Sequence, residues 1–303
     1  MIKVIFMGTP DYADEILKKL INENEIEVVA VYTQPDKPVG RKKLLTAPPV
    51  KVTAREHSIP IYQPVRLREE DVVNHLLTIE CDYIIVAAYG QILPRKILEH
   101  APCINLHASI LPQYRGASPI QQTLLNGDKE TGVTAMLMEE GLDTGDIIKI
   151  EKISVADDEM LESLFIRLTQ VAADLTVDVL KNFHAYTPVP QDDYKATHCK
   201  KITKADGLVE FDDVEILFNK YRAFTPWPGI YLSSKLKLKR IALHDKESQN
   251  EAGKILAIDK ESIIVGCNRG SIKIYRVQPE SKKEMDIFSY INGKRLSVAD
   301  YLS

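Results

Sequence analysis

Two side chains with complementary chemistry lie two residues apart near the middle of the chain. Asn105 and His107 end the apolar run CINLH, and a spacing of two turns both side chains to one face of an extended strand. The amide is a neutral hydrogen-bond donor and the imidazole is a titratable one. Together they could hold a developing oxyanion while a proton moves. A histidine that only caps the strand end is the alternative.

A carboxylate that could complete this pair occurs in the segment MEEGLDTGD. Asp143 lies there in a loop between two predicted strands, among glycines and other acidic residues. A carboxylate beside His107 would orient the ring and favour its protonated form, as acid/base work near neutral pH requires. A solvated acidic turn explains the same residues, and the sequence alone leaves both interpretations open.

Other kinds of catalytic site have no support in the sequence. There is no HxxEH or similar ligand cluster, so no metal is expected, and neither a GxSxG elbow nor a Walker A loop is present. The first strand is followed by MGTPDYADE, which lacks the second and third glycines of a GxGxxG turn. A nicotinamide or flavin cofactor is therefore disfavoured.

The elements that would carry these residues alternate between short apolar strands and amphipathic segments. Runs such as IKVIFM, EVVAVYT, DYIIVAAY and CINLH are separated by helix-length stretches, which predicts an α/β fold with a Rossmann-like, doubly wound, mostly parallel sheet. Asn105 and His107 then fall at the carboxyl end of a central strand, where such sheets place their sites. GVTAMLME and DIIKIEKI predict two further strands, and DDEMLESLFIRLTQVAADLTVDVLKNF predicts a helix of about seven turns.

The character of the chain changes after the long helix. Residues 1–185 are predicted to form the first domain, residues 186–203 a linker rich in proline and polar residues, and residues 204–303 a smaller domain. One helix within FDDVEILFNKYRAFTPWPG is followed by short, closely spaced strands with Gly or Asn turns. This pattern predicts a small β-barrel.

The composition indicates the cellular compartment of the protein and the partners that it could bind. The 303-residue chain has a net charge of −4, divided as −8 over residues 1–200 and +4 over residues 201–303. The four cysteines lack CxxC spacing and are expected to be reduced. The N-terminus resembles neither a signal peptide nor a membrane span, so we expect a soluble cytoplasmic protein without membrane contact.

Two basic segments are candidates for binding phosphates. In SSKLKLKR, Lys235, Lys237 and Lys239 alternate and should share one face of a strand, although a solvated edge strand would also carry lysines. The long segment Thr33 to Lys51 concentrates Arg41, Lys42 and Lys43 between prolines. It predicts a mobile basic finger, with a solvated flexible loop as the alternative.

Several of these segments together resemble one family. INLHASILPQYRGASPI is similar to the signature of the formyltransferases that use 10-formyltetrahydrofolate, and EEGLDTGD is similar to the loop that carries their catalytic aspartate. With TQPDKPVGRKK, AAYGQILP and RAFTPWPG, the chain resembles over nearly its whole length the members that act on methionyl-tRNA. The resemblance implies formyl transfer from 10-formyltetrahydrofolate to the α-amino group of initiator methionyl-tRNA, for translation initiation, by a monomer.

The resemblance also implies roles for particular residues. Asn105 and protonated His107 would stabilise the oxyanion, and Asp143 would hold His107 and help move a proton through water to the leaving folate. Arg41, Lys42 and Lys43 would contact the acceptor end of the tRNA, and the C-terminal OB-like barrel, with Lys235, Lys237 and Lys239, would bind its phosphates. The folate pocket would be formed by Gln91, Ile92, Leu93, Ser109, Ile110, Leu111, Pro112, Glu139, Glu140, Gly141 and Leu142.

Two other functions stay open on the sequence alone. A folate-dependent formyltransferase for a small amine, such as an amino sugar nucleotide, would share the N-terminal domain but would not need the basic finger. A non-catalytic RNA-binding protein would not need Asn105, His107 and Asp143 together. Formylation of the sugar nucleotide would indicate the first alternative, and tRNA binding without transfer the second.

Overall fold

The computed structural model describes residues 1–40 and 42–302, and it divides into two compact units. The N-terminal unit contains residues 1–119, 130–155 and 164–199. The C-terminal unit contains residues 120–129, 156–163 and 200–303. Two short stretches that precede residue 200, 120–129 and 156–163, therefore belong to the C-terminal unit. No described helix is both long and apolar enough to cross a membrane.

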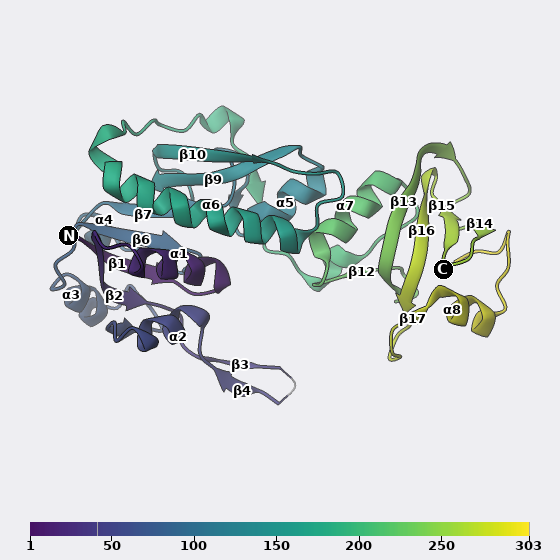
Figure 1. Cartoon of the computed structure of the whole chain (residues 1–303), viewed down its shortest axis with the longest axis horizontal. Helices are drawn as coiled ribbons and strands as arrows, with labels where there is room; N and C mark the ends of the chain where they lie inside the picture. The colour runs from purple at the N-terminus through teal and green to yellow at the C-terminus, as the bar shows by residue number, and fades with distance from the viewer. Residues whose placement is uncertain (41, 303) are drawn as a thin grey trace. The chain divides into compact units, whose positions relative to one another are not determined.

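The N-terminal unit is built on one seven-stranded sheet (Figure 1), in the order β10-β9-β7-β6-β1-β2-β5. Five strands are mutually parallel, β9 runs antiparallel to its neighbour β7, and β10 at the edge runs antiparallel to β9. The predicted Rossmann-like, mostly parallel sheet is confirmed. The strands are β1 (Ile2–Gly8), β2 (Ile26–Tyr32), β5 (Ile61–Tyr62), β6 (Tyr83–Ala87), β7 (Cys103–His107), β9 (Glu130–Leu137) and β10 (Ile147–Ser154).

Helices cover both faces of this sheet, because the inner strands are buried on both sides. On one face, the Tyr12 ring of α1 (Asp11–Ile21) lies 6.2 Å from the Phe165 ring of α6 (Leu161–Asn182), and α2 (Pro49–Glu56) packs beside α1. On the other, α3 (Glu70–Leu76) and α4 (Arg95–Leu98) supply Val73 and Ile97 to a core with Ile84. At 22 residues α6 makes about six turns rather than seven, since the acidic residues before it stay outside the helix.

Two segments predicted to lack regular structure have some. The finger is a β-hairpin of β3 (Lys37–Val39) and β4 (Leu44–Thr46), which Figure 1 shows projecting from the N-terminal unit. The 3-10 helix η1 (Phe183–Ala185) ends just before the predicted linker, which contains the 3-10 helix η2 (Asp193–Lys195) and strand β11 (His198–Cys199). Strand β11 pairs in parallel with β8 (Arg115–Gly116), so this stretch belongs to the fold.

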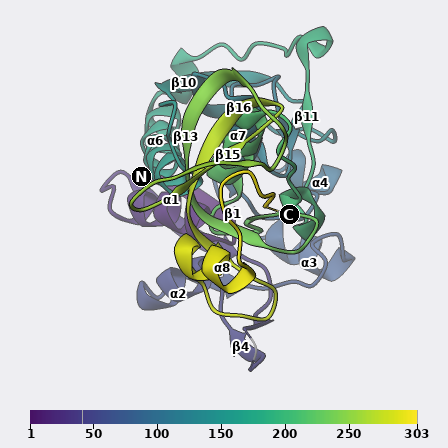
Figure 2. The same ribbon diagram turned by 90° about the vertical axis from the view of Figure 1, so that its right-hand side faces the viewer.

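The C-terminal unit is a small β domain, as predicted. Its strand order is β12-β13-β16-β15-β14, with β17 paired to β16, and Figure 2 shows the long β13 and β16 side by side with α8 below them. The elements are α5 (Pro119–Asn126), η3 (Lys204–Gly207), α7 (Val214–Phe224), β12 (Ile230–Tyr231), β13 (Lys237–Gln249), β14 (Ile255–Ile258), β15 (Ile263–Gly266), β16 (Arg269–Gln278), β17 (Met285–Asp286) and α8 (Ile287–Lys294).

The cysteines are free, as the sequence predicts. Cys103, Cys199 and Cys267 are buried, and Cys81 is half-buried. Burial raises the pKa of Cys103 to about 12, and burial together with nearby carboxylates raises that of Cys267 to about 12. These thiols are therefore neutral packing groups near neutral pH.

Candidate active site

The end of β7 presents the amide and the imidazole where the sequence predicts them. Asn105 pairs with Val86 of β6 on one side and Met136 of β9 on the other, and His107 pairs with Thr134. The His107 side chain is buried and Asn105 is half-buried. The backbone of β7 is therefore held by a neighbouring strand on each side, and sheets of this kind place their sites at the carboxyl ends of the strands.

A tight turn ends β7 and prevents the strand from continuing past His107. The Ser109 hydroxyl donates to the Gln113 carbonyl at 2.6 Å, and the Thr134 hydroxyl donates to the Ser109 carbonyl at 2.7 Å. Thr134 also accepts from the Leu111 backbone N–H at 3.1 Å. Because Ser109 and Thr134 are buried, these bonds hold the turn rigidly beneath the site.

Asp143 joins this pair from the loop between β9 and β10. Its carboxylate accepts from Asn105 Nδ2 at 3.3 Å and from the Gly116 backbone N–H at 2.9 Å, and its Oδ2 lies 3.7 Å from His107 Nδ1. Asp143 is 9 % exposed, and its φ of +54° is in the left-handed region. The structure thus brings together the three predicted catalytic residues from segments 38 residues apart.

The hydrogen bonds of His107 determine which ring nitrogen faces the site. Nε2 lies 2.9 Å from the Tyr114 carbonyl oxygen, which can only accept, so Nε2 must carry a hydrogen. In the neutral ring Nδ1 is then a bare acceptor. In the protonated ring it carries a second hydrogen directed toward Asp143. A proton enters or leaves at Nδ1 only.

Residues of the predicted linker support the site, and sequence analysis missed them. Gln191 Nε2 donates to the carbonyl oxygens of Asp143 and Gly145 at 3.0 and 2.7 Å. Its Oε1 accepts from Arg115 Nη2 at 2.8 Å. Cys199 Sγ lies 3.3 Å from both the Ser118 N–H and the Tyr114 carbonyl. No local pattern marks Gln191, since its contacts lie at least 46 residues away.

The residues predicted to line a folate pocket fall into two groups. Leu93, Ser109 and Leu111 are buried, and the Gln91 side chain is occupied by Leu67 N at 2.7 Å and the Pro64 carbonyl at 3.1 Å. These residues can shape a pocket and offer backbone hydrogen bonds to a ligand. The side-chain amide of Gln91 is already bonded within the protein. In contrast, Ile92 is 82 % exposed and Leu142 is 68 % exposed.

The other exposed members of this set lie in the Asp143 loop itself, between β9 and β10. Glu139, Glu140 and Gly141 are exposed, Ile110 and Pro112 are half-buried, and Pro112 follows Leu111 through a cis peptide bond. Gly141 is required by space, because a Cβ there would lie 2.0 Å from Thr144 Oγ1. Exposed apolar side chains next to bonded polar groups are suited to a flat, partly apolar ligand.

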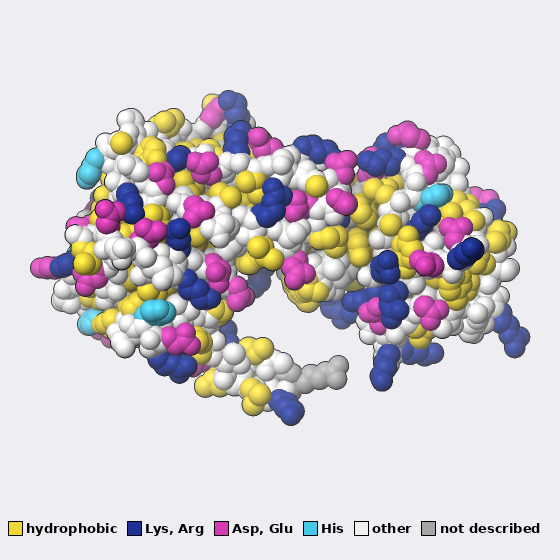
Figure 3. Space-filling view, viewed as in Figure 1, with side chains coloured by type: hydrophobic (Ala, Val, Ile, Leu, Met, Phe, Trp, Pro, Cys, Tyr) yellow, Lys and Arg dark blue, Asp and Glu magenta, His cyan; other side chains and the backbone are white. Residues whose placement is uncertain are grey.

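The hairpin is fixed at its base and exposed at its tip. Asp36 accepts from Lys51 Nζ at 2.8 Å and from Gln63 Nε2 at 2.8 Å, and these bonds lower the pKa of Asp36. Figure 3 shows hydrophobic side chains on the projecting hairpin; Val39, Leu44 and Leu45 are each more than half exposed. Lys42 and Lys43 are exposed, and Arg41 lies outside the described residues.

The prediction of one lysine face in the C-terminal unit is wrong in part. Lys235 precedes β13 in a turn, where its φ is +65° and its ammonium pairs with Glu280 at 2.7 Å. Lys237 and Lys239 lie on β13, but the register shifts between Leu238 and Arg240. The bulge breaks the alternation, which is why the period-two pattern misplaced these side chains.

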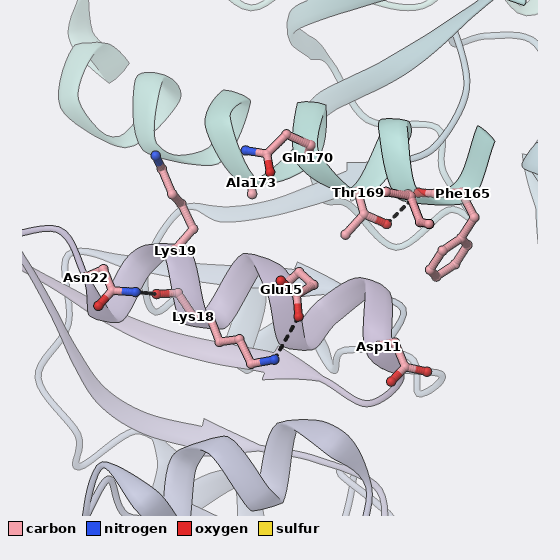
Figure 4. Close-up of a pocket in the computed structure, with 10 residues that line it drawn as sticks. Asp11, Glu15, Lys18, Lys19, Asn22, Phe165, Thr169, Gln170 and Ala173 are labelled. Atoms are coloured by element: carbon pink, nitrogen blue, oxygen red, sulfur yellow. Dashed lines mark hydrogen bonds and ion pairs between the residues drawn. The ribbon is translucent and has the colours of Figure 1, made fainter. Parts of the chain in front are cut away.

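A separate groove of about 570 Å³ lies between α1 and α6 (Figure 4). Its polar lining is largely satisfied, since Lys18 pairs with Glu15 at 2.7 Å and with Asp14 at 2.8 Å. None of the residues predicted for catalysis or folate binding lines it. The chemistry therefore belongs to the end of β7 and not to this groove.

Comparison with protein families gives the class of protein. The formyl transferase family matches residues 2–180, and the formyl transferase C-terminal domain matches residues 201–295. The chain belongs to the formyl transferase family. The matched ranges contain the end of β7, the Asp143 loop and the small β domain.

Individual relatives carry a more particular name. A methionyl-tRNA formyltransferase of Sulfurimonas denitrificans is 70 % identical over 301 residues, covering 99 % of this chain and 100 % of the relative. One from Nitratiruptor sp. is 53 % identical over 300 residues, covering 98 % and 99 %. Such full-length identity includes the hairpin and the C-terminal unit as well as the site.

Solved structures share the fold at low identity. WlaRD, a sugar 3N-formyl transferase, aligns with a TM-score of 0.67 and 17 % identity over 93 % of this chain and 99 % of its own. HypX from Aquifex aeolicus, in complex with tetrahydrofolic acid, aligns with a TM-score of 0.61 and 16 % identity over 97 % of this chain and 48 % of its own. These likenesses concern the fold alone.

Proposed function

We propose that this chain is a methionyl-tRNA formyltransferase, which transfers a formyl group from 10-formyltetrahydrofolate to the α-amino group of initiator methionyl-tRNA. The observation that carries this proposal is the full-length identity of 70 % to a methionyl-tRNA formyltransferase. The convergence of Asn105, His107 and Asp143 at the end of β7 supports it on chemical grounds. The tRNA substrate places the reaction in the cytoplasm, where translation begins.

The proposed reaction is a direct transfer between two nitrogens. The neutral amine of the methionyl ester attacks the formyl carbon, forming the new C–N bond and placing negative charge on the formyl oxygen. The bond to N10 of the folate then breaks, N10 takes a proton, and the attacking amine loses one. An α-amine has a pKa of roughly 7.7 to 8.0, so a useful fraction is neutral near pH 7 without a strong base.

The three residues have distinct tasks in this scheme. Asn105 donates one amide hydrogen to Asp143 and keeps the other for the developing oxyanion. His107 acts through Nδ1, because Nε2 is bonded to the Tyr114 carbonyl. Asp143 stabilises the protonated ring across 3.7 Å and, through water, helps carry the proton from the amine to N10.

The folate is expected to lie over the exposed apolar side chains beside the site. Ile92 and Leu142 are positioned to cover a flat heterocycle, while the backbone of the segments around Gln91, Ser109 and Glu139 offers hydrogen bonds to its edge. The bonded Gln91 amide sets the shape of its segment rather than contacting the folate.

Features outside the site favour tRNA over a small amine. The hairpin carries Arg41, Lys42 and Lys43 on an acidic N-terminal half, and its apolar residues suit stacking against an opened acceptor end. The C-terminal third has a net charge of +4, suited to tRNA phosphates. Lys237 and Lys239 remain candidate contacts, and Lys235 must first leave Glu280. We expect the protein to catalyse formyl transfer as a monomer.

The decisive test is formyl transfer to charged initiator tRNA by the wild type and two variants. Asp143→Asn should lower kcat by roughly 10²–10³-fold, because the carboxylate that stabilises charged His107 is lost. Arg41→Ala should raise KM for tRNA with kcat kept. Lys152→Ala, which removes an exposed charge on β10, is the control and should behave as wild type.

The alternatives give different results in the same assay. Tight tRNA binding without transfer would identify a non-catalytic RNA-binding protein. Transfer to an amino sugar nucleotide and not to methionyl-tRNA would identify a small-amine formyltransferase. Either result would overturn the proposed function.

A further inference from the structure

The backbone at Asp143 needs external support. Its φ of +54° is in the left-handed region, which a residue with a Cβ adopts only when its surroundings impose it. Two carbonyl oxygens of this loop, those of Asp143 and Gly145, accept hydrogen bonds from the same amide nitrogen, Nε2 of Gln191, at 3.0 and 2.7 Å. One side chain from a distant segment thus fixes the loop at its strained residue and two residues beyond it.

The Gln191 amide is itself oriented by a buried cation. Arg115, which is 4 % exposed, directs Nε and Nη2 at Gln191 Oε1, at 3.1 and 2.8 Å. Its Nη2 also donates to Asp193 Oδ1 at 2.8 Å. A guanidinium can only donate and a carbonyl can only accept, so the amide has a single permitted orientation. Charge-assisted bonds of this kind are the strong ones.

The residue after Arg115 holds the other part of Asp143. The Gly116 N–H donates to Asp143 Oδ2 at 2.9 Å, so the β8 segment bonds the carboxylate directly and the backbone through Gln191. Strand β11 pairs with β8 and keeps the two segments together. The placement of the Asp143 carboxylate beside Asn105 and His107 therefore depends on a side chain that bonds only the backbone of this loop and not the carboxylate.

We propose that Gln191 is a positioning residue for the reaction: oriented by Arg115, it holds the Asp143 loop in the backbone conformation that places the carboxylate against Asn105 and His107. This inference rests on the proposed function. It assigns a task to a segment that otherwise joins the two units of the chain. Both ends of the Gln191 amide are already bonded within the protein, so its effect should be on the rate of transfer and not on the binding of either substrate.

The proposal predicts a specific response to Gln191→Glu. The change keeps the shape but replaces the donor by an anion facing two carbonyl oxygens, so the loop must move. A displacement of about 1 Å at a reacting group can lower a rate by roughly 100-fold, and we expect a loss of that order in kcat with both KM values within about twofold. Gln191→Met, neutral and of similar length, should lower kcat in the same way and carries the test if the glutamate variant does not fold.

A control separates positioning from simple attachment of the segment. Thr197 Oγ1 accepts from the Tyr114 N–H at 2.9 Å and so ties the same segment to the same turn without contacting the Asp143 loop. Thr197→Val removes that bond with little change in shape. It should lower the melting temperature and leave kcat within about twofold of wild type.

The second readout is the combination with Asp143→Asn. If Gln191 acts through the Asp143 carboxylate, Gln191→Met should cause no further loss of kcat once that carboxylate is gone. Three results would overturn the inference: a loss of kcat in the double variant equal to the product of the two single losses, a wild-type kcat in both Gln191 variants, or an effect on KM alone. In each case an active wild type leaves the proposed function intact. An inactive wild type would instead overturn the proposed function.

Discussion

At Asp143, every polar group that the structure shows in contact serves to aim one carboxylate. Its two oxygens accept from Asn105 and Gly116 and face His107, and its backbone carbonyl accepts from Gln191. Polar groups bonded in this way cost no reorganisation when charge develops beside them. The site is therefore arranged before a substrate arrives, which is the property that a direct transfer without a covalent intermediate requires.

The first residue-scale prediction concerns Asn105→Asp. The change keeps the size of the side chain but removes its donor and adds a second negative charge about 3.3 Å from Asp143 Oδ1. We expect kcat for formyl transfer to fall by roughly 10²–10³-fold, since an anion replaces a group that stabilises an oxyanion. Asn292→Asp, the same chemical change at an exposed position of α8, is the control. Equal activity of the two variants would show that Asn105 does not contact the reacting oxygen.

A second prediction follows from the raised pKa values of the thiols. Burial and the negative charge of the nearby Asp82 raise the pKa of Cys81 to about 11, and burial raises the pKa of Cys103 to about 12. At pH 7.5 fewer than roughly one in a thousand of these thiols is a thiolate, against about a tenth for a free cysteine. Thiol-reactive dyes should therefore label the folded protein slowly, with Cys81 the fastest.

The pH dependence of this labelling has a definite sign. The thiolate fraction rises about tenfold for each pH unit below the pKa, so the labelling rate should rise tenfold between pH 8 and pH 9. Labelling of four thiols in urea gives the total. Fast, pH-independent labelling of any thiol in the folded protein would contradict the burial seen here.

At the scale of elements, the site depends on two short strands far apart in the sequence. Strand β8 follows the turn beneath His107, and β11 returns 83 residues later to pair with it. Gly116 makes this pairing possible. Its φ is +120°, and a Cβ built on it would lie 2.3 Å from the Cys199 carbonyl oxygen.

Gly116→Ala should therefore separate β8 from β11. The left-handed φ and the contact with backbone atoms both oppose a side chain, and we expect a loss of about 1–3 kcal/mol in unfolding free energy, measured as a lower melting temperature. Loss of the Gly116 bond to Asp143 should lower kcat as well.

Gly293→Ala is the matched control for this change. Gly293 lies in α8, its added Cβ would meet nothing within 4 Å, and alanine is favoured over glycine in helices by roughly 0.5–1 kcal/mol. This variant should be unchanged or slightly more stable. A Gly116 variant as stable as the Gly293 variant would show that the two strands pair without the glycine.

The sequence predicts well those features that depend on neighbouring residues, and poorly those that depend on contacts between distant segments. The alternation in CINLH predicts that Asn105 and His107 share one face of a central strand, at its carboxyl end. The structure has the strand and its end where they are predicted. The partnership of Asp143 with this pair was accessible only as a hypothesis, because a loop has no period. Gln191 carries no signal at all, since its contacts are made by residues 46 to 76 positions away.

The lysines in and just before β13 show the same limit in another form. A period of two predicts one face for Lys235, Lys237 and Lys239, but the partner strand β16 fixes the register and imposes a shift beside Lys239. A bulge is set by both strands of a pair, so one strand's sequence does not reveal it.

At the scale of the whole molecule, the C-terminal unit is discontinuous in sequence. Arg222 of α7 is 3 % exposed and donates to the carbonyl oxygens of Leu124, Ala156 and Glu159 at 3.3 to 3.4 Å. Burial lowers the pKa of this guanidinium, and its partners lie in the stretches 120–129 and 156–163. The unit is thus completed by residues that precede most of it in the chain.

A fragment of residues 200–303 should therefore lack part of its interior. In the full chain, Arg222→Met should cost roughly 1–3 kcal/mol, because the buried Leu124 carbonyl and the part-buried carbonyls of Ala156 and Glu159 lose their donor. In the fragment these partners are absent, so the same change should be neutral or stabilising. Thermal unfolding of the four proteins tests this difference. An equal loss in chain and fragment would show that Arg222 does not depend on the two stretches.

The discontinuity also sets an order of events during synthesis. Residues 120–129 and 156–163 leave the ribosome well before residues 200–303, whereas all of the N-terminal unit has been made once residue 199 emerges. At 5–20 residues per second, the remaining hundred or so residues take about 5–20 s. During that interval the two earlier pieces wait for the rest of the C-terminal unit, of which Arg222 is made within the first quarter. We expect the nascent chain to be most vulnerable to proteases and most dependent on chaperones at this stage.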